Sequence, residues 1–323
     1  MFVIVFNPLP RGPNDMDFIT IWLASVPDFA VPFALTALGL IVTERSGVLS
    51  LGAEGFMLVG AMAAVGAQIV TGHPVLALVI AMVAASLVSA LFAVMAVWLR
   101  INQIIAGLAI VFFCEGGTGL MGTLLEWTNH PVTGLGVLDP GAFVALPWLR
   151  RLLEQNAIVY LTPLIFAAVA WYLYRTTSGL RLRAVGENPQ AADAAGIAVL
   201  RYRFVAVLAG AAIMGLAGGY ISVVSTKLWI PGMTGGRGWI SIGLVIFARW
   251  SPWRALAGAL LFGGIEALIP QLAASGIALP QYFVLMSPYL ITLGVMIWVA
   301  MKTQDGGGSP ASIGEPYLRE ERR

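Results

Sequence analysis

The sequence is poor in charged residues and in the side chains that form disulfides and hold metals. Only 11% of its 323 residues are charged, whereas soluble domains carry about 25%. The single cysteine, Cys114, excludes an internal disulfide and a Cys-x-x-Cys site. The two histidines, His73 and His130, each precede a proline in a predicted loop and have no carboxylates at ligand spacing. We therefore expect no metal site, and no nucleic-acid partner is expected.

What the chain has in abundance is apolar residues, which make up 59% of the sequence and give a mean hydropathy of +0.87. A soluble domain of this length would need a polar surface that this composition does not supply. The first ten residues lack a charged segment followed by a long apolar core, so they are not expected to form a cleavable signal peptide. The composition predicts an all-α, polytopic membrane protein.

Nine segments are candidates for membrane spans, because a bilayer core of about 30 Å needs about 20 apolar residues per helix. The segments are residues 18–43, 54–71, 74–99, 101–123, 157–174, 204–225, 239–250, 254–273 and 282–301. The first contains Pro27 and Pro32, which predict a short helix, a break and a second helix. The seventh is too short to cross alone, since twelve residues of helix cover about 18 Å.

The Lys and Arg residues near the span ends predict an orientation, because cytoplasmic loops are enriched in them. One side collects Arg45, Arg100, Arg175, Arg181, Arg183, Arg201, Arg203, Arg249, Arg254 and Lys302. The other side collects only Arg11, Arg150, Arg151, Lys227 and Arg237. The first side is therefore predicted to be cytoplasmic, with the N-terminus outside and the C-terminus inside.

These spans define a transmembrane domain over residues 1–301 and a tail over 302–323. The outer loop, residues 124–156, carries a predicted surface helix at 147–155, and it either caps the outer helix ends or docks an external partner. The tail begins with glycines and continues with mixed polar residues, so it is predicted to be a disordered cytoplasmic segment without a function of its own.

Two segments interrupt the pattern of continuous helices. The first break, residues 46–55, is too apolar for a solvated loop but contains Gly47, Gly52 and Gly55. The second break, residues 232–239, contains Gly236 and Gly238. Irregular backbone at membrane depth needs protein or a water-filled cavity around it. The breaks fall on opposite sides of the membrane and predict an inverted repeat whose broken helices meet at the midplane. The alternative is two ordinary glycine-rich turns.

The loop of residues 175–203 contains a short predicted helix on the arginine-rich side. Asn188 is suited to cap this helix and Pro189 to occupy its first position. Gly196 is suited to end it. The small side chains of the helix would let the backbone of another protein approach closely.

Four stretches, taken together, resemble the branched-chain amino acid and simple-sugar permease family of ABC importers. GENPQAADAAGI, residues 186–197, resembles the coupling segment of that family. ERSGVLSLGAEG, residues 44–55, resembles its ERxGVxNLGxEG motif, and NQIIAGL, residues 102–108, its NQxxxGL motif. GRGWI at 236–240, continuing to Trp250-Ser251-Pro252, resembles GRGfI…GrwxP. The match runs in order through roughly residues 30–300 and is typical of the shorter permease of nucleoside-type importers. Ser50 in place of asparagine, and Ile110-Val111 in the fourth span, depart from the pattern.

The resemblance implies a bacterial inner-membrane subunit that works with a second permease, an external substrate-binding lipoprotein and a cytoplasmic ABC ATPase. ATP and Mg²⁺ would bind on that ATPase, because this chain has no Gly-x-x-x-x-Gly-Lys-Ser/Thr loop. The residues expected to contact the ATPase are Arg183, Glu187, Asn188, Ala191, Ala192 and Gly196.

The residues expected to line a path for a nucleoside or purine-like solute are mostly polar groups at span starts or within spans. They are Glu54, Asn102, Gln103, Glu115, Trp239 and Ser241. Glu115 and Glu266 lie inside apolar spans, where a carboxylate is costly and predicts either a functional role or a bond to a neighbouring helix. Several tryptophans, Trp250 among them, are expected in interfacial belts.

Two other functions are compatible with parts of the pattern. A simple-sugar permease of the same family is the nearer alternative. A proton-coupled secondary transporter would use the intramembrane glutamates and also favours broken helices, but it has no need of a helix that docks an ATPase. An intramembrane enzyme is disfavoured, since no catalytic residue pattern falls on the spans.

Overall fold

The computed structural model describes residues 15–138, 147–274 and 308–318, together with single positions between 286 and 301. The described part is helical and contains no strand, only two isolated β-bridges. The helices are α1 (Asp15–Glu44), α2 (Ala53–Thr71), α3 (Pro74–Ala93), α4 (Gln103–Leu124), α5 (Pro147–Leu153), α6 (Ala157–Arg175), α7 (Thr177–Glu187), α8 (Pro189–Ala194), α9 (Val199–Gly219), α10 (Arg237–Ala248) and α11 (Pro252–Ala274). Two π-helical turns, η1 (Val94–Trp98) and η3 (Tyr220–Ser225), extend α3 and α9.

Seven helices of the described part are long and apolar enough to cross a membrane, and they coincide with seven of the nine predicted spans. The predicted short seventh span is α10, with twelve residues. The predicted ninth span, residues 282–301, lies outside the continuously described residues. The break expected within the first span is wrong, because α1 is one helix that contains Pro27 and Pro32.

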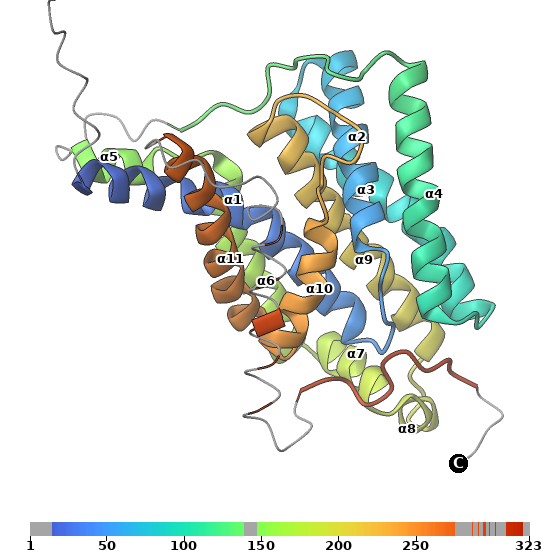
Figure 1. The fold of residues 1–323 in the computed structure, drawn as a ribbon. Coiled ribbons are helices and arrows are strands. Elements are labelled where there is room, and N and C mark those ends of the chain that lie inside the picture. The colour runs from blue at the N-terminus through green and yellow to red at the C-terminus, as the bar shows by residue number, and fades with distance from the viewer. Residues whose placement is uncertain are drawn as a thin grey trace, which may run out of the picture.

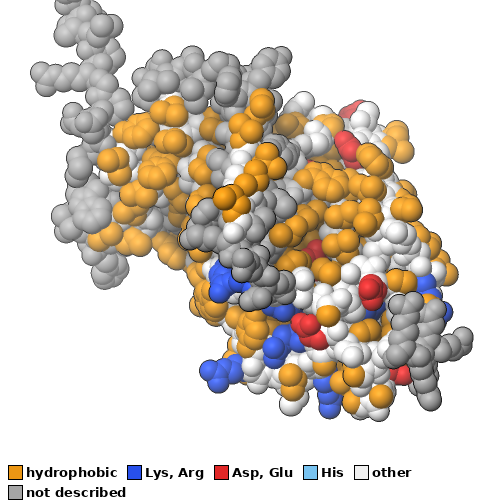
Figure 2. Space-filling model, turned by 60° about the horizontal axis from the view of Figure 1, so that its bottom comes forward, with side chains coloured by type: hydrophobic (Ala, Val, Ile, Leu, Met, Phe, Trp, Pro, Cys, Tyr) orange, Lys and Arg blue, Asp and Glu red, His pale blue; other side chains and the backbone are white. Residues whose placement is uncertain are grey.

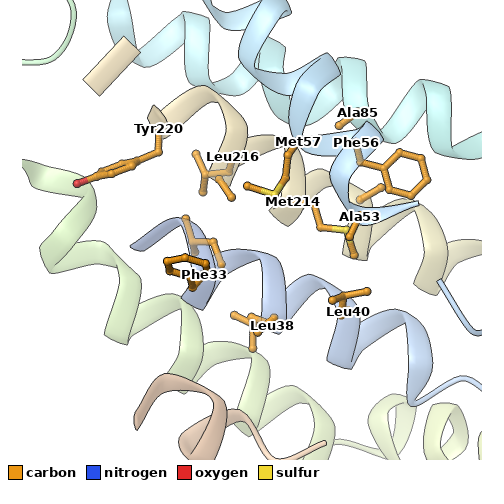
Figure 3. Packing of buried hydrophobic residues seen from close by; sticks show 14 of the residues in the cluster. Phe33, Leu38, Leu40, Ala53, Phe56, Met57, Ala85, Met214, Leu216 and Tyr220 are labelled. Atoms are coloured by element: carbon orange, nitrogen blue, oxygen red, sulfur yellow. The ribbon is translucent and has the colours of Figure 1, made fainter. Parts of the chain in front are cut away.

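The core lies where α1, α2, α3 and α9 pack together. Figure 3 shows large side chains of α1, α2 and α9 there, with Ala85 on α3. Close helix approach depends on glycine. A Cβ atom on Gly39 of α1 would collide with the backbone oxygen of Gly210 on α9. The same holds for Gly60 of α2 against Gly215 of α9. Such small-residue contacts are typical of helices that associate in lipid.

The outer loop is a cap in its described part. The amide of Asn129 donates to the carbonyl of Trp229, and the amide of Val132 donates to the carbonyl of Lys227. At the same end, the hydroxyl of Tyr220 donates to Asp28, and the side-chain amide of Asn156 donates to Tyr220 over 3.0 Å. The described part of this loop therefore bonds to the segment after η3, and Asn156 links the start of α6 to Tyr220.

Charged residues gather at the opposite end of the molecule, which α7 and α8 form (Figures 1 and 2). The flanks of the helices carry mostly apolar side chains (Figure 2). On α4, for example, Phe112 and Phe113 are both more than 60% exposed. This distribution is typical of a chain whose sides contact lipid or further subunits.

Candidate coupling and translocation site

The two breaks contact each other inside the molecule. Figure 1 shows the segment that leads into α2 and the segment that leads into α10 entering the interior from opposite ends. Glu54, in the first turn of α2, joins them. Its carboxylate accepts hydrogen bonds from the Thr234 hydroxyl over 2.6 Å and from the amides of Gly236 over 2.9 Å and Gly238 over 2.7 Å. Glu54 thus caps the N-terminus of α10, where the helix dipole favours an anion.

Glycine is needed at the point where α10 touches α2. A Cβ atom on Gly238 would lie 2.5 Å from the backbone nitrogen of Glu54, which is too close for two non-bonded atoms. Gly236, at the N-cap of α10, has a φ of 82°, a conformation that glycine adopts without strain. The glycines of the second break are therefore explained by close approach and by the turn.

The NQxxxGL motif fastens α4 to the first break. Gln103 is buried, and its side-chain oxygen accepts a hydrogen bond from the amide of Leu49 over 2.7 Å. Asn102 caps α4 by accepting from the amides of Ile104 and Ile105. Within the described part of the chain, the Gln103 side-chain nitrogen and the Ser50 hydroxyl are buried without a hydrogen-bond partner.

The other predicted path residues divide into engaged and exposed side chains. Ser241 is buried and donates to the carbonyl of Arg237, one turn earlier in α10. Trp239 is 36% exposed at the start of α10, beside the Glu54 contact. Glu115 is exposed on α4, and the described residues offer its side chain no hydrogen bond. Glu266 pairs with Arg237, with 3.3 Å between the charged atoms, so it bonds a neighbouring helix.

Arg237 has to be removed from the count of Lys and Arg residues that predicts the orientation. The sequence places it in an outer loop, but it is the first residue of α10, is partly buried and pairs with α11. Without Arg237 the count of Lys and Arg is ten on one side and four on the other, so the predicted orientation does not change.

Two residue pairs from the family motifs, Glu44-Arg45 and Arg249-Trp250, contact each other at the charged end. Glu44, at the end of α1, accepts from the Trp250 indole nitrogen over 2.6 Å. Arg45 donates to the Trp250 carbonyl over 3.1 Å. Arg249 and Trp250 both have positive φ, and these bonds hold the tight turn between α10 and α11. Trp250 therefore stabilises a turn. The expectation that it lies in an interfacial belt is wrong.

The predicted docking helix forms as α8. The Asn188 side chain accepts from the amide of Ala191 over 2.9 Å, and Gly196 ends the segment with a φ of 77°. Glu187 and Ala191 are exposed, so they lie on the surface that a partner can reach. Ala192 is buried.

Arg183, by contrast, does not project from this surface. It donates to the carbonyl of Leu173 over 3.0 Å and lies over the ring of Tyr174. Its position supports the C-terminus of α6, where a cation is favoured by the helix dipole.

The coupling segment contacts the first break directly. A Cβ atom on Gly186, at the end of α7, would collide with the carbonyl oxygen of Arg45 and lie 3.1 Å from the amide of Gly47. The backbone between α7 and α8 thus rests on the turn that leads into the first break. No side chain separates the two segments at this point.

Residues 308–318 form a C-terminal strap across this contact (Figure 1). Ser312 donates to the carbonyl of Gly186 from its amide over 3.0 Å and from its hydroxyl over 2.7 Å. The amide of Gly314 donates to the carbonyl of Gly47 over 3.2 Å. The guanidinium of Arg203, only 1% exposed, donates to the Ser312 hydroxyl and to the carbonyl of Glu315. The disorder expected for the tail is therefore wrong for these residues.

Sequence reasoning missed Arg203, Thr234 and the strap as parts of this site. The sequence carries no usable signal for Arg203, because it precedes the predicted span 204–225 and was counted among the flanking arginines, whereas it lies inside α9. Thr234 lies within the second break, but its partner Glu54 is far away in the sequence. Nothing in the strap itself indicates where it binds.

The fold and this junction define a class: a multi-pass helical membrane protein with broken helices and a short, exposed helix, α8, at its charged end. Comparison with known proteins gives the family. The model of the branched-chain amino acid transport system permease component family matches residues 24–300. The chain belongs to that family, whose members are transport subunits.

Three curated relatives cover nearly the whole chain. The "Putative glucose ABC transporter permease protein TsgC13" of Haloferax volcanii is 33% identical, over 94% of this chain and 99% of its own length. The guanosine ABC transporter permease protein NupQ of Bacillus subtilis is 31% identical, over 95% and 100%. The nucleoside ABC transporter permease protein NupC of Lactococcus lactis is 29% identical, over 88% and 93%. This chain is thus similar to ABC permease subunits along almost its full length.

Proposed function

We propose that this chain, as the permease subunit of an ABC importer, forms part of a path for a nucleoside or purine-like solute. Two relatives that match along nearly their full length are named for guanosine and for nucleosides. The exposed indole of Trp239 beside the Glu54 contact supports the proposal, because a nucleobase binds to aromatic faces with a few placed polar groups. The buried, unpartnered groups of Ser50 and Gln103 lie next to the same junction.

A sugar is the second candidate, and the glucose name of one relative favours it. Transport assays separate the two. The importer would be reconstituted in liposomes with its external binding protein, and ATP-dependent uptake of labelled guanosine and labelled glucose would be compared. The proposal expects guanosine uptake to be the faster. Uptake of glucose alone would overturn the nucleoside assignment and leave the permease function intact.

The proposed partners follow from the family. A second permease, a longer paralogue of this chain or a second copy of it, would complete the path. A cytoplasmic ATPase would bind ATP and Mg²⁺, and an external lipoprotein would deliver the solute. The relatives support a second permease, since guanosine permeases NupQ and NupP of Bacillus subtilis both match this chain. The location would be a bacterial inner membrane, with the N-terminus outside and the α8 end in the cytoplasm.

The contact between Gly186, at the end of α7 and next to α8, and the start of the first break supports a mechanism for coupling. The ATPase would move α8, and the contact of Gly186 with Arg45 would pass this movement to the first break. Glu54 would then pass it to the second break and α10. Both breaks border the proposed path, so a shift of this kind would open or close it.

Substitution on α8 tests this coupling step. Ala191→Glu adds a charged side chain to the exposed face of α8, whereas Thr177→Glu adds the same charge to the exposed start of α7. We expect Ala191→Glu to abolish co-purification of the ATPase and Thr177→Glu to preserve it. If the ATPase still co-purifies with the Ala191→Glu protein, α8 is not the docking site.

A further inference from the structure

A cavity of about 920 Å³ lies between α6, α7 and α9, and Gly196 is the one predicted coupling or path residue among those that line it. The wall farther from the charged end is apolar and includes Val169 of α6 and Val205, Ala209 and Ile213 of α9. Val205 is 55% exposed, so the cavity opens on the flank of the helices. The wall formed by α9 runs from Ala198 to Ile213, a length of about 22 Å along a helix.

The polar groups of the cavity gather at its charged end. Arg181 of α7 and Arg201 of α9 both line it there and are both exposed. In the described part of the chain, neither arginine has a hydrogen bond or an ion pair. The hydroxyls of Tyr172 and Ser178, 3.1 Å apart, lie at the same end.

This arrangement matches the dimensions and the polarity of one membrane leaflet. Half of a bilayer core is about 15 Å thick, so the apolar wall spans the acyl-chain region and the arginines reach the headgroup level. Basic pockets between helices on the cytoplasmic side of membrane proteins bind anionic headgroups. A cytoplasmic protein would contact the arginines but not the apolar wall deep along α9. We propose that this cavity binds an anionic phospholipid of the cytoplasmic leaflet, with its phosphate at Arg181 and Arg201.

A bound lipid would also touch the coupling region. Arg181 belongs to α7, and the cavity wall includes Ala195 and Gly196, which follow α8. The lipid would therefore bridge α6 and the segment between α8 and α9. The activity of the importer should consequently depend on anionic lipid. This inference goes beyond the choice of solute and does not depend on it.

The test is a lipid titration of the assembled importer in detergent, followed by native mass spectrometry. The probes are phosphatidylglycerol and phosphatidylcholine of the same acyl chains. The test variant is Arg181→Gln with Arg201→Gln. Its matched control is Arg175→Gln with Arg254→Gln, which removes the same charge from exposed arginines outside the cavity.

We expect tight binding of phosphatidylglycerol to the wild type and a loss of about 30-fold in the test variant, since each arginine near a membrane surface contributes about fivefold. The control variant should bind as the wild type does. Equal binding of both lipids by the wild type, or an equal loss in both variants, would overturn the proposal.

A second arm identifies the occupant without changing charge. A Val205→Cys variant places a thiol on the exposed wall, and the only native cysteine, Cys114, is buried elsewhere in the molecule. In membranes, this thiol should react with a lipid-soluble maleimide and should not be cross-linked to another subunit. Cross-linking to the second permease would show that a protein covers the cavity, and it would refute lipid binding.

Discussion

The C-terminal strap should fasten the coupling segment, and Ser312→Ala is the smallest change that tests it. The Ser312 hydroxyl donates to the carbonyl of Gly186 over 2.7 Å and accepts from the Arg203 guanidinium over 3.2 Å. The substitution removes both bonds and leaves the backbone of the strap in place. The carbonyl of Glu315 still accepts from Arg203, so one partner of the buried cation remains.

The expected loss follows from the two bonds. A neutral hydrogen bond contributes about 1 kcal/mol and one to a charged group about 1.5–3 kcal/mol, so the strap should lose about 2.5–4 kcal/mol of stability. Because 1.4 kcal/mol corresponds to a tenfold change, local opening should become at least about 60-fold more frequent. Arg203, which is 1% exposed, is what raises the loss above that of an ordinary surface serine.

Amide hydrogen exchange of the importer in nanodiscs measures this opening. Peptides from the strap and from residues 184–192 should both exchange faster in the Ser312→Ala protein, and the ratio of transport to ATP hydrolysis should fall. Ser309→Ala is the control, because Ser309 is exposed in the same segment. Unchanged exchange in both regions would refute the view that the strap fastens the coupling segment.

Three further substitutions test the contacts around the breaks. Glu54→Gln keeps the size of the side chain but turns one hydrogen-bond acceptor into a donor, so transport should fall at least tenfold while the ATPase still binds. Normal transport would remove Glu54 from the coupling route. Gly238→Ala should destabilise the purified permease by about 1–3 kcal/mol in thermal unfolding, whereas Gly117→Ala, which has open space for a Cβ, should not; equal melting temperatures would contradict the close approach. Trp250→Phe removes the hydrogen bond to the buried Glu44 carboxylate and should lower the free energy of unfolding by about 1.5–3 kcal/mol, measured by thermal unfolding. An unchanged melting temperature would show that this bond is dispensable.

Much of the fold could be predicted because its signals are local. Hydropathy over about 20 residues locates a span, and seven predicted spans are present as helices. Asn188 and Gly196 are cap residues, and they begin and end α8 where their chemistry predicts. The continuity of α1 was missed because Pro27 and Pro32 weaken a helix locally, whereas packing of α1 against α9 and α11 stabilises it as a whole.

The contacts within the site could be predicted only in part, because they join residues far apart in the sequence. That two breaks in one membrane domain should meet follows from the need to bury irregular backbone. That Glu54 should be the joining residue does not follow, since any polar side chain near either break could do so. The strap shows the same limit, because a short polar segment gains its structure from residues far away in the sequence, among them Gly47, Gly186 and Arg203. The inverted repeat remains a prediction.

The junction transmits displacement well because its links are short and involve backbone. Gly186 touches the backbone of Arg45 without an intervening side chain, and the strap bonds to Gly186 and Gly47 together. Glu54 then holds the second break through two backbone amides and one hydroxyl. A long, flexible side chain at any of these points would absorb a movement of one or two ångströms by changing its rotamer. Glycine at the contacts and a buried carboxylate between the breaks leave no such slack, so a movement of α8 should reach α10 with little loss.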